Sequence, residues 1–215
     1  MNIIKKIFRT LSFSSSIIET YFLFKKHLKP KGWVLSRYLY QPVDSDGQPI
    51  PWVTYASLHF ISQKLENTSF NLFEYGSGNS TLWFSKRVKY IISVEHDANY
   101  YEIIKNKIKL PSNITYILSD IKNDYSKKVL DYKDEFHIII IDGRDRITCT
   151  KNSLKALRQD GIIIWDNTDR EKYQEAYDFL SNAGFKKIDF KGLGPIGHIE
   201  WQTSIFYKSN NCFNI

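Results

Sequence analysis

The sequence is poor in cysteine, and this scarcity excludes two kinds of small protein. Among its 215 residues only Cys149 and Cys212 are cysteines. The chain therefore has neither a disulfide framework nor a four-cysteine zinc site. So few cysteines fit a reducing compartment, and we expect a cytoplasmic protein. Polar tracts are short and aromatic residues make up 15% of the chain, which disfavours a disordered protein.

The chain also lacks an uninterrupted apolar run of the roughly 18 residues needed to cross a bilayer. Residues 1–30 begin with basic residues followed by an apolar stretch, as a signal peptide does. Serines dilute this stretch, Glu19 interrupts it and no small-x-small cleavage site follows. We interpret residues 1–69 as an N-terminal helical extension or cap, and residues 70–215 as the main domain.

The start of the chain shows helical periodicity. The apolar residues that recur at this spacing are Ile3, Ile4, Ile7, Phe8 and Leu11. Such a helix either packs on the domain or on a second subunit of a homodimer, or lies on a membrane surface. In the second case Lys5, Lys6 and Arg9 would face anionic lipid.

The formal net charge is +7, from 30 basic and 23 acidic residues. A positive surplus suits an anionic partner such as nucleic acid or a membrane. The lysines, however, are scattered in pairs along the chain, at 5–6, 25–26, 127–128 and 186–187. We interpret the charge mainly as solvation and do not expect nucleic acid as a partner.

From Asn71 onward, short apolar runs alternate with amphipathic stretches. Strands are predicted at 71–75, 90–94, 114–118, 136–141, 161–165, 185–190 and 203–207. Helices are predicted at about 80–88, at 147–158, at 169–183 before Gly184, and after the second strand with Tyr100, Ile104 and Ile108 on one face. This alternation predicts βαβ units in a mostly parallel sheet, closed by an antiparallel hairpin. Ligands of such sheets bind beyond the carboxyl ends of the strands.

A glycine-containing loop follows the first predicted strand, in the stretch Glu74-Tyr75-Gly76-Ser77-Gly78-Asn79-Ser80. Glycines let the backbone turn tightly and approach a ligand closely. The third glycine of the dinucleotide fingerprint is missing, because Thr81 occupies its place. This absence disfavours nicotinamide and flavin cofactors, whose pyrophosphate needs a close helix N-terminus.

Acidic residues follow the next two strands. Glu95 lies about twenty residues beyond the loop, where a carboxylate can accept hydrogen bonds from both hydroxyls of a ribose. The alternative is a surface acid or a helix cap, a role that Asp97 fits better. Asp120 follows the third strand, where it either accepts from an adenine amino group or caps a helix.

Together the E-x-G-x-G-x-S loop, the two spaced acids and the Ile-Asp-Gly that ends strand four resemble class I S-adenosylmethionine-dependent methyltransferases. The resemblance covers about residues 70–207. It implies a doubly wound, seven-stranded α/β sheet of order 3-2-1-4-5-7-6 with an antiparallel last strand. It also implies S-adenosylmethionine as cofactor, with Glu74, Gly76 and Gly78 at its methionine end, Ser77 and Ser80 in the same binding loop, Glu95 at the ribose and Asp120 at the adenine.

Polar side chains also follow strands four and five. Asp142, Asp166 and Asn167 can converge there, because adjacent parallel strands lie about 4.8 Å apart. Two carboxylates and an amide oxygen suit Mg²⁺. The set resembles the metal-dependent O-methyltransferases of the catechol type. That type has a lysine three residues after the first acid, where this chain has Asp145. The alternative is that these residues cap helices.

Without a metal, methyl transfer to a hydroxyl needs a general base. Asp142 is the first candidate and His198, in the loop between the last two strands, is the second. A single loop histidine is also consistent with plain surface. Arg144 and Arg146 either bind an anionic group of the substrate or pair with surface acids. We expect O-methylation of a small molecule or a glycan. The alternatives are a nucleic-acid methyltransferase and a non-catalytic binding module of the same fold.

Trp52 and Tyr55 lie in a proline-stiffened segment before the first strand. They either pack in the core or shape the pocket of the substrate or the methionine end of the cofactor.

Overall fold

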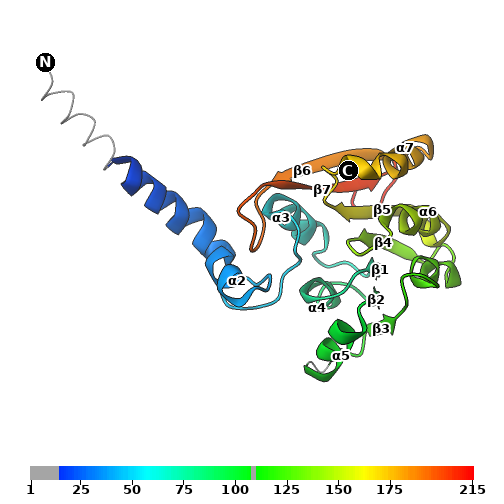
Figure 1. The fold of residues 1–215 in the computed structure, drawn as a ribbon. Helices are drawn as coiled ribbons and strands as arrows, with labels where there is room; N and C mark the ends of the chain where they lie inside the picture. Colours follow the sequence, from blue (N-terminus) through cyan, green and yellow to red (C-terminus); the bar gives the residue numbers. More distant parts are fainter. Residues whose placement is uncertain (1–14, 108–109) are drawn as a thin grey trace, which may run out of the picture.

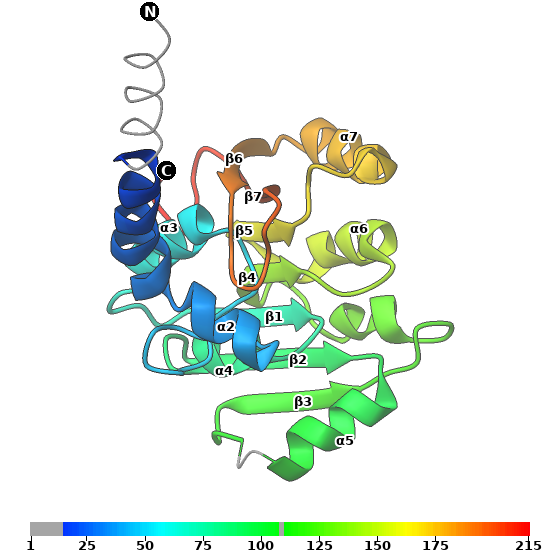
Figure 2. The same cartoon turned by 60° about the vertical axis from the view of Figure 1, so that its left-hand side comes forward.

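A single seven-stranded sheet forms the centre of the molecule in the computed structural model, which describes residues 15–107 and 110–215 (Figure 1). The strands are β1 (Asn71–Tyr75), β2 (Tyr90–Glu95), β3 (Ile114–Leu118), β4 (Phe136–Ile141), β5 (Leu157–Asp166), β6 (Lys186–Gly192) and β7 (Trp201–Tyr207). Their order is β3-β2-β1-β4-β5-β7-β6, which confirms the predicted topology. β1 to β5 are parallel, and β7 runs antiparallel to both β5 and β6. Figure 2 shows β1, β2 and β3 running in the same direction.

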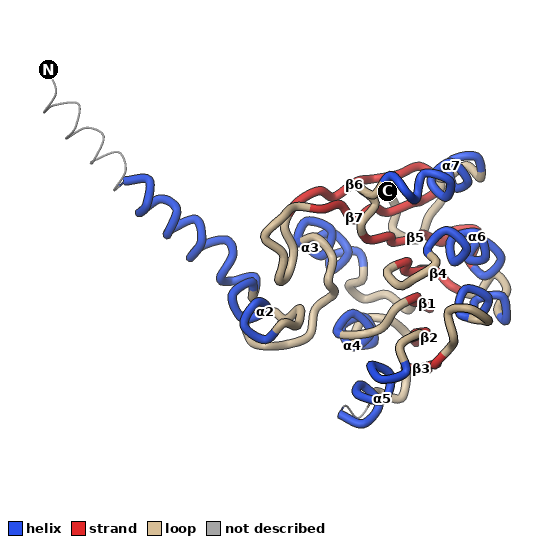
Figure 3. The backbone as a smooth tube through the Cα atoms, viewed as in Figure 1, coloured by secondary structure: helices blue, strands red, loops and turns tan. Residues whose placement is uncertain are grey.

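Helices cover both faces of the sheet, with α3 and α4 on one side and α6 and α7 on the other (Figures 1 and 3). The α-helices are α2 (Trp33–Leu39), α3 (Tyr55–Lys64), α4 (Asn79–Ser85), α5 (Ala98–Lys107), α6 (Arg146–Ala156) and α7 (Gln174–Asn182). The shorter helical segments are η1 (Phe24–Leu28), η2 (Lys29–Lys31), η3 (Tyr125–Asp131) and η4 (Glu171–Tyr173). Residues 15–23 are also helical.

The two-residue period of β1 divides the core into two clusters. Phe73 and Tyr75 pack toward α6 and α7, whereas Leu72 packs toward α3 and α4. β1 and β4 are buried on both faces, as their continuous apolar runs predict. α3 contributes Ile61 to the second cluster. The boundary expected after residue 69 therefore runs between two elements that share one core.

Two element boundaries differ from the prediction. β5 begins at Leu157 rather than Gly161, and α6 accordingly ends at Ala156. The reason is that Leu157 is buried and pairs with Phe136, followed by a register shift along the strand. The helix predicted from residue 169 starts at Gln174 after the turn η4, because the backbone N–H of Thr168 donates to Gln202 of β7 instead. Gly184 has a φ of +83° and follows the helix as predicted.

The helix of residues 15–31 projects from the rest of the molecule in both views (Figures 1 and 2). The periodic residues 3–11 and Ile108 lie outside the described residues. Among the residues that the structure describes, no helix has the length and hydropathy to cross a membrane.

Candidate active site

Backbone contact between two glycines brings the loops after β1 and β4 together. Gly76 has a φ of +92°, and a Cβ on it would lie 3.1 Å from the backbone of Gly143. A Cβ on Gly143 would lie 1.8 Å from the Tyr125 hydroxyl and 3.0 Å from the Gly76 nitrogen. Only glycine fits either position without displacement. The loops therefore meet at the carboxyl ends of the two central strands.

Glu74 lies beneath the glycine loop and holds it. The side chain is buried, and its Oε2 accepts hydrogen bonds from the hydroxyls of Thr81 (2.5 Å) and Ser93 (2.8 Å). The Thr81 hydroxyl in turn accepts from the Gly78 N–H. Thr81 thus uses the place of the missing third glycine to tie the loop to Glu74. Burial raises the pKa of Glu74 to about 7.

Glu95 at the end of β2 points toward the same loop. Its Oε2 accepts from the N–H (3.2 Å) and the hydroxyl (2.5 Å) of Ser77, and its Oε1 accepts from the N–H groups of His96 and Asp97. The Ser77 hydroxyl also lies 2.8 Å from the hydroxyl of Tyr116 on β3. The carboxylate is therefore fixed between the first loop and the end of the second strand, where a ribose was expected.

Two cavities flank the glycine loop. One, of about 630 Å³, is lined by loop residues 77–80 and by Tyr100, Trp52 and Asp142. The other, of about 340 Å³, lies between the loop, Glu95 and the segment that follows β4. The Tyr100 hydroxyl would lie 2.9 Å from a Cβ on Gly78, so this ring covers the loop. Tyr100 was expected only as part of an apolar helix face.

Of the two residues that follow β3, Ser119 is buried and Asp120 is exposed. Ser119 is buried and its hydroxyl has no hydrogen-bond partner among the described residues. Asp120 is exposed, and its carboxylate accepts from the Lys122 N–H (3.0 Å) and the Asn123 amide (2.8 Å). These are the contacts of a turn cap, and Asp120 lines neither cavity beside the loop. Its role at an adenine stays a prediction.

These features fit S-adenosylmethionine. A glycine loop leaves room for close approach, and a fixed carboxylate can accept from ribose hydroxyls. The chain's own residues offer no phosphate-binding lysine or arginine on the loop itself. The arrangement suits a nucleoside that carries a sulfonium group and no phosphate.

Asp142, directly after β4, is held by a buried arginine. Arg146 donates to its Oδ1 (3.0 Å) and to its carbonyl oxygen (2.9 Å), and also to the carbonyl oxygen of Asp166. Arg146 therefore ties the ends of β4 and β5 together, and neither predicted role for it, a substrate contact or a surface pair, is what the structure shows. Arg144 is exposed beside the smaller cavity. Burial raises the pKa of Asp142, while Arg146 opposes the shift.

Asp166 ends β5 and is almost fully buried. Its Oδ1 accepts from the indole N–H of Trp201 (2.9 Å) and from the hydroxyl of Thr203 (2.5 Å) on β7. The antiparallel register places Thr203 directly opposite Asp166. Burial and, next, the charge of Asp142 raise the pKa of Asp166. This carboxylate thus anchors the start of β7 to the end of β5.

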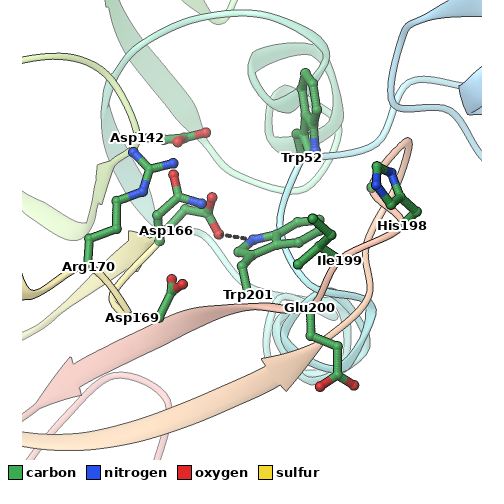
Figure 4. Close-up of a pocket in the computed structure, with 11 residues that line it drawn as sticks. Trp52, Asp142, Asp166, Asp169, Arg170, His198, Ile199, Glu200 and Trp201 are labelled. Carbon is green, nitrogen blue, oxygen red and sulfur yellow. Dashed lines mark hydrogen bonds between the residues drawn. The ribbon is translucent and has the colours of Figure 1, made fainter.

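A third cavity, of about 660 Å³, opens in front of these carboxylates (Figure 4). Asp142, Asp166 and Arg170 lie on one side of it, and His198 lies on the opposite side. The cavity is lined by Trp52, Asp142, Asp166, Asn167, Asp169, Arg170, Gly197, His198, Ile199, Glu200 and Trp201. The structure thus brings Asp142, Asp166, Asn167 and His198 to one cavity, with His198 across the opening from the carboxylates.

The donor set does not fit a resident Mg²⁺. The Oδ1 of Asp142 is bound by the Arg146 cation, and the Oδ1 of Asp166 accepts from two protein donors. A second cation, Arg170, lines the same cavity. Within residues 15–107 and 110–215, no group of three or more His, Cys, Asp or Glu side chains is arranged to hold a metal.

The sequence analysis left the place of Trp52 and Tyr55 open and did not identify two other residues of the site. Trp52 is 47% exposed and lines two cavities, so it is not a core residue, whereas Tyr55 is buried. Trp201 and Arg170 were not expected at the site. A signal for Trp201 exists in the sequence, since a last strand that runs antiparallel to β5 must begin where β5 ends. Arg170 has no such signal, because it lies in an irregular segment.

Comparisons with known proteins agree with this geometry. Residues 73–168 match the protein family described as "Methyltransferase domain". No curated protein sequence matches the chain. The matched segment includes the glycine loop, Glu95, Asp142 and Asp166.

Solved structures of methyltransferases have a similar fold. A precorrin-6y C5,15-methyltransferase from Geobacter metallireducens has a TM-score of 0.58 at 15% identity, over 74% of this chain and 91% of that one. A putative O-methyltransferase from Klebsiella pneumoniae has a TM-score of 0.54 at 16% identity, over 71% and 77%. A tRNA methyltransferase from Aquifex aeolicus has a TM-score of 0.54 at 14% identity, over 74% and 70%. At these identities the likeness concerns the fold.

Proposed function

We propose that this chain is a class I S-adenosylmethionine-dependent methyltransferase that methylates a hydroxyl group of a small molecule or a glycan. The observation that carries the proposal is the place of Asp142. This residue lines both cavities beside the glycine loop and also the cavity between Trp52 and Trp201. It is therefore the point where a cofactor at the loop and an acceptor in the third cavity would meet.

The cofactor, when bound, supplies a methyl group on a sulfonium centre. Asp142 is about one-third exposed to the cavities, and Arg146 fixes its orientation. An acceptor hydroxyl donates its proton to the Asp142 carboxylate as its oxygen forms a bond to the methyl carbon. The bound cofactor would supply the methyl group, and its sulfur would keep the electron pair of the broken carbon–sulfur bond. Because burial raises the pKa of Asp142, its carboxylate is a stronger base than an exposed aspartate.

The lining of the acceptor cavity supports a neutral, hydroxyl-rich acceptor. Trp52 and Trp201 offer flat apolar faces, and Asp142 and Asp169 offer acceptors for hydroxyl groups. A sugar has both an apolar ring face and several hydroxyl donors. Nucleic acid fits less well, because the carboxylates here outnumber the single guanidinium of Arg170.

Two measurements test the proposal. Calorimetry should detect binding of S-adenosylmethionine or its demethylated product, and Glu95→Gln should weaken it by about 1–3 kcal/mol because a polar partner is lost. Asp97→Asn is the matched control, since the Asp97 carboxylate accepts a hydrogen bond from the Tyr100 N–H and so caps α5. Absence of binding by the folded wild-type protein would overturn the assignment of the cofactor.

Methyl transfer is measured as release of the demethylated cofactor with a panel of sugars and phenols. Asp142→Asn should lower kcat about 100- to 10,000-fold and leave cofactor affinity intact. Asp169→Asn keeps an oxygen acceptor on the same cavity and removes no proposed base, so it should leave kcat unchanged and alter at most KM. The rate should rise with pH through the raised pKa of Asp142, since only the ionised form accepts a proton. If His198→Gln abolishes transfer and Asp142→Asn does not, His198 is the base.

A further inference from the structure

The projecting helix of residues 15–31 carries an exposed apolar stripe. Ile17, Ile18, Tyr21 and Phe22 are each 48–55% exposed. At i, i+1, i+4 and i+5 they share one side of the helix, while Ser16, Glu19 and Thr20 lie on the other. Water solvates such a stripe poorly, so it favours an apolar partner.

Cations continue the stripe on the next turn. Lys25 lies over the ring of Tyr21 and Lys26 over the ring of Phe22, each with Nζ 5.8 Å from the ring centre. Lys29 and Lys31 follow in η2. Aromatic rings backed by lysines suit the boundary between lipid headgroups and acyl chains, where the lysine stems extend along apolar surface to reach phosphate.

The net positive charge of the chain is concentrated in its first 31 residues. Residues 1–31 contain seven Lys and Arg residues and one acid, Glu19. They thus hold six of the seven net positive charges, and the rest of the chain is nearly neutral. Within residues 15–31 four lysines stand against Glu19, a net charge of +3, whereas the acceptor cavity is lined by more acids than basic residues.

We propose that the helix of residues 15–31 docks on an anionic lipid surface, with Ile17, Ile18, Tyr21 and Phe22 in the acyl boundary. Nucleic acid would use the lysines but leave the apolar stripe in water. A second copy of the chain would cover the stripe but add another positive segment beside the first. An anionic bilayer satisfies both features. This proposal does not depend on the proposed function.

Docking would also place the acceptor cavity near the bilayer. The ring of Phe24 contacts Trp33 of α2, with ring centres 6.3 Å apart. The Trp33 indole N–H donates to Gly197 (2.8 Å), and the Arg37 guanidinium donates to Ile196 (2.9 Å). Both carbonyl oxygens, those of Ile196 and Gly197, belong to the loop between β6 and β7 that carries His198. The helix is therefore joined to one wall of the cavity.

The test is flotation of the full chain with two kinds of vesicle, pure phosphatidylcholine and a mixture with phosphatidylglycerol. The chain should float with the mixed vesicles and far less with the pure ones. Lys25→Gln/Lys26→Gln should lower the partition about thirtyfold, from the known attraction per lysine. Ile18→Ser/Phe22→Ser should lower it by at least about thirtyfold through lost apolar burial.

The control variants change the same types of residue, apolar or lysine, at positions outside the apolar stripe and its neighbouring lysines. Leu23→Ser changes an exposed apolar residue on the polar side of the helix, and Lys186→Gln/Lys187→Gln changes a lysine pair on β6. Both should float like the wild type. The proposal is overturned if the wild type floats with neither vesicle, or if the controls lose as much as the stripe variants. It is also overturned if ultracentrifugation shows a dimer that Ile18→Ser/Phe22→Ser dissociates, or if the chain binds an RNA duplex but no vesicle.

Discussion

The glycine loop and the acceptor cavity meet at Asp142, yet they are assembled differently. The loop is held by partners close in sequence: Thr81 bonds Glu74 seven residues away, and Ser77 bonds Glu95 eighteen residues away. The acceptor cavity joins segments near residues 52, 142, 166 and 201. The contrast teaches that the hydrogen bonds holding the glycine loop to Glu74 and Glu95 lie within one βαβ unit, whereas the acceptor side exists only once the whole sheet has formed.

The largest expected effect concerns the clamp between β4 and β5. Arg146→Met keeps much of the side-chain volume but leaves Asp142 without its cation. We expect a loss of about 3 kcal/mol in the free energy of unfolding, the low end for breaking a buried pair because Asp142 is partly exposed. Urea unfolding measures it. Lys151→Met, at an exposed ion pair, is the control and should change stability by less than about 1 kcal/mol.

If Arg146→Met proves no more costly than Lys151→Met, the long-range clamp does not hold the acceptor side and the contrast between the two regions fails.

The next effect concerns the loop side and depends on pH. Burial raises the pKa of Glu74 from its ordinary 4.5 to about 7, so the folded state binds the proton more tightly than the unfolded state. The stabilisation by this proton is complete below pH 4.5 and is lost as the pH rises through 7. Glu74→Gln removes the dependence, and Gln can still accept from Thr81 and Ser93. We expect the variant to be up to about 3 kcal/mol more stable than the wild type at pH 8.

Urea unfolding at pH 5 and pH 8 gives the difference between the variant and the wild type. The raised pKa of Asp166 affects both proteins alike and cancels in this difference, whereas that of Asp142 cancels only in part, because the Glu74 charge is one of its causes. A constant difference across this range would show that Glu74 is ionised in the folded state, and that the loop rests on a buried charge.

The smallest effect concerns one hydrogen bond of the acceptor side. Trp201→Phe keeps an aromatic wall but removes the indole donor to Asp166. We expect a loss of about 1 kcal/mol in unfolding free energy. Trp52→Phe is the control, since the Trp52 indole makes no hydrogen bond to the described residues, and its change should stay within about 0.5 kcal/mol. Equal losses for both variants would mean that Asp166 does not depend on Trp201.

Sequence reasoning reached the loop side more completely than the acceptor side. The glycine loop and the carboxylate of Glu95 beside it were expected, because they depend on local periodicity and on spacing within one βαβ unit. The strand order was expected only from the resemblance to class I methyltransferases. Asp142, Asp166 and Asn167 were expected together, because strand ends of a parallel sheet share an edge. The buried position of Arg146 was not expected, since its partners are carbonyl oxygens of two strands that pair only in the folded sheet.

Several expectations stay predictions: the adenine role of Asp120, the ribose role of Glu95, a homodimer and a cytoplasmic location. The interpretation of the net charge as general solvation gives way to the proposal of a lipid-binding helix. Lysine pairs occur along the whole chain, but residues 32–215 are nearly balanced in charge. The positive surplus therefore lies almost entirely in residues 1–31.

By itself, the sequence determined the alternation of strands and helices, the closing hairpin and the glycine turn, because periodicity and backbone freedom act over a few residues. Only the tertiary structure decided that Arg146 would neutralise Asp142, that Trp201 would bond Asp166 and that Trp52 would stand at the cavity. The first two contacts join residues 4 and 35 positions apart in the sequence, and they form only where strands from different parts of the chain come into register. Burial at that junction, which no local pattern encodes, sets the proton affinity of the carboxylates.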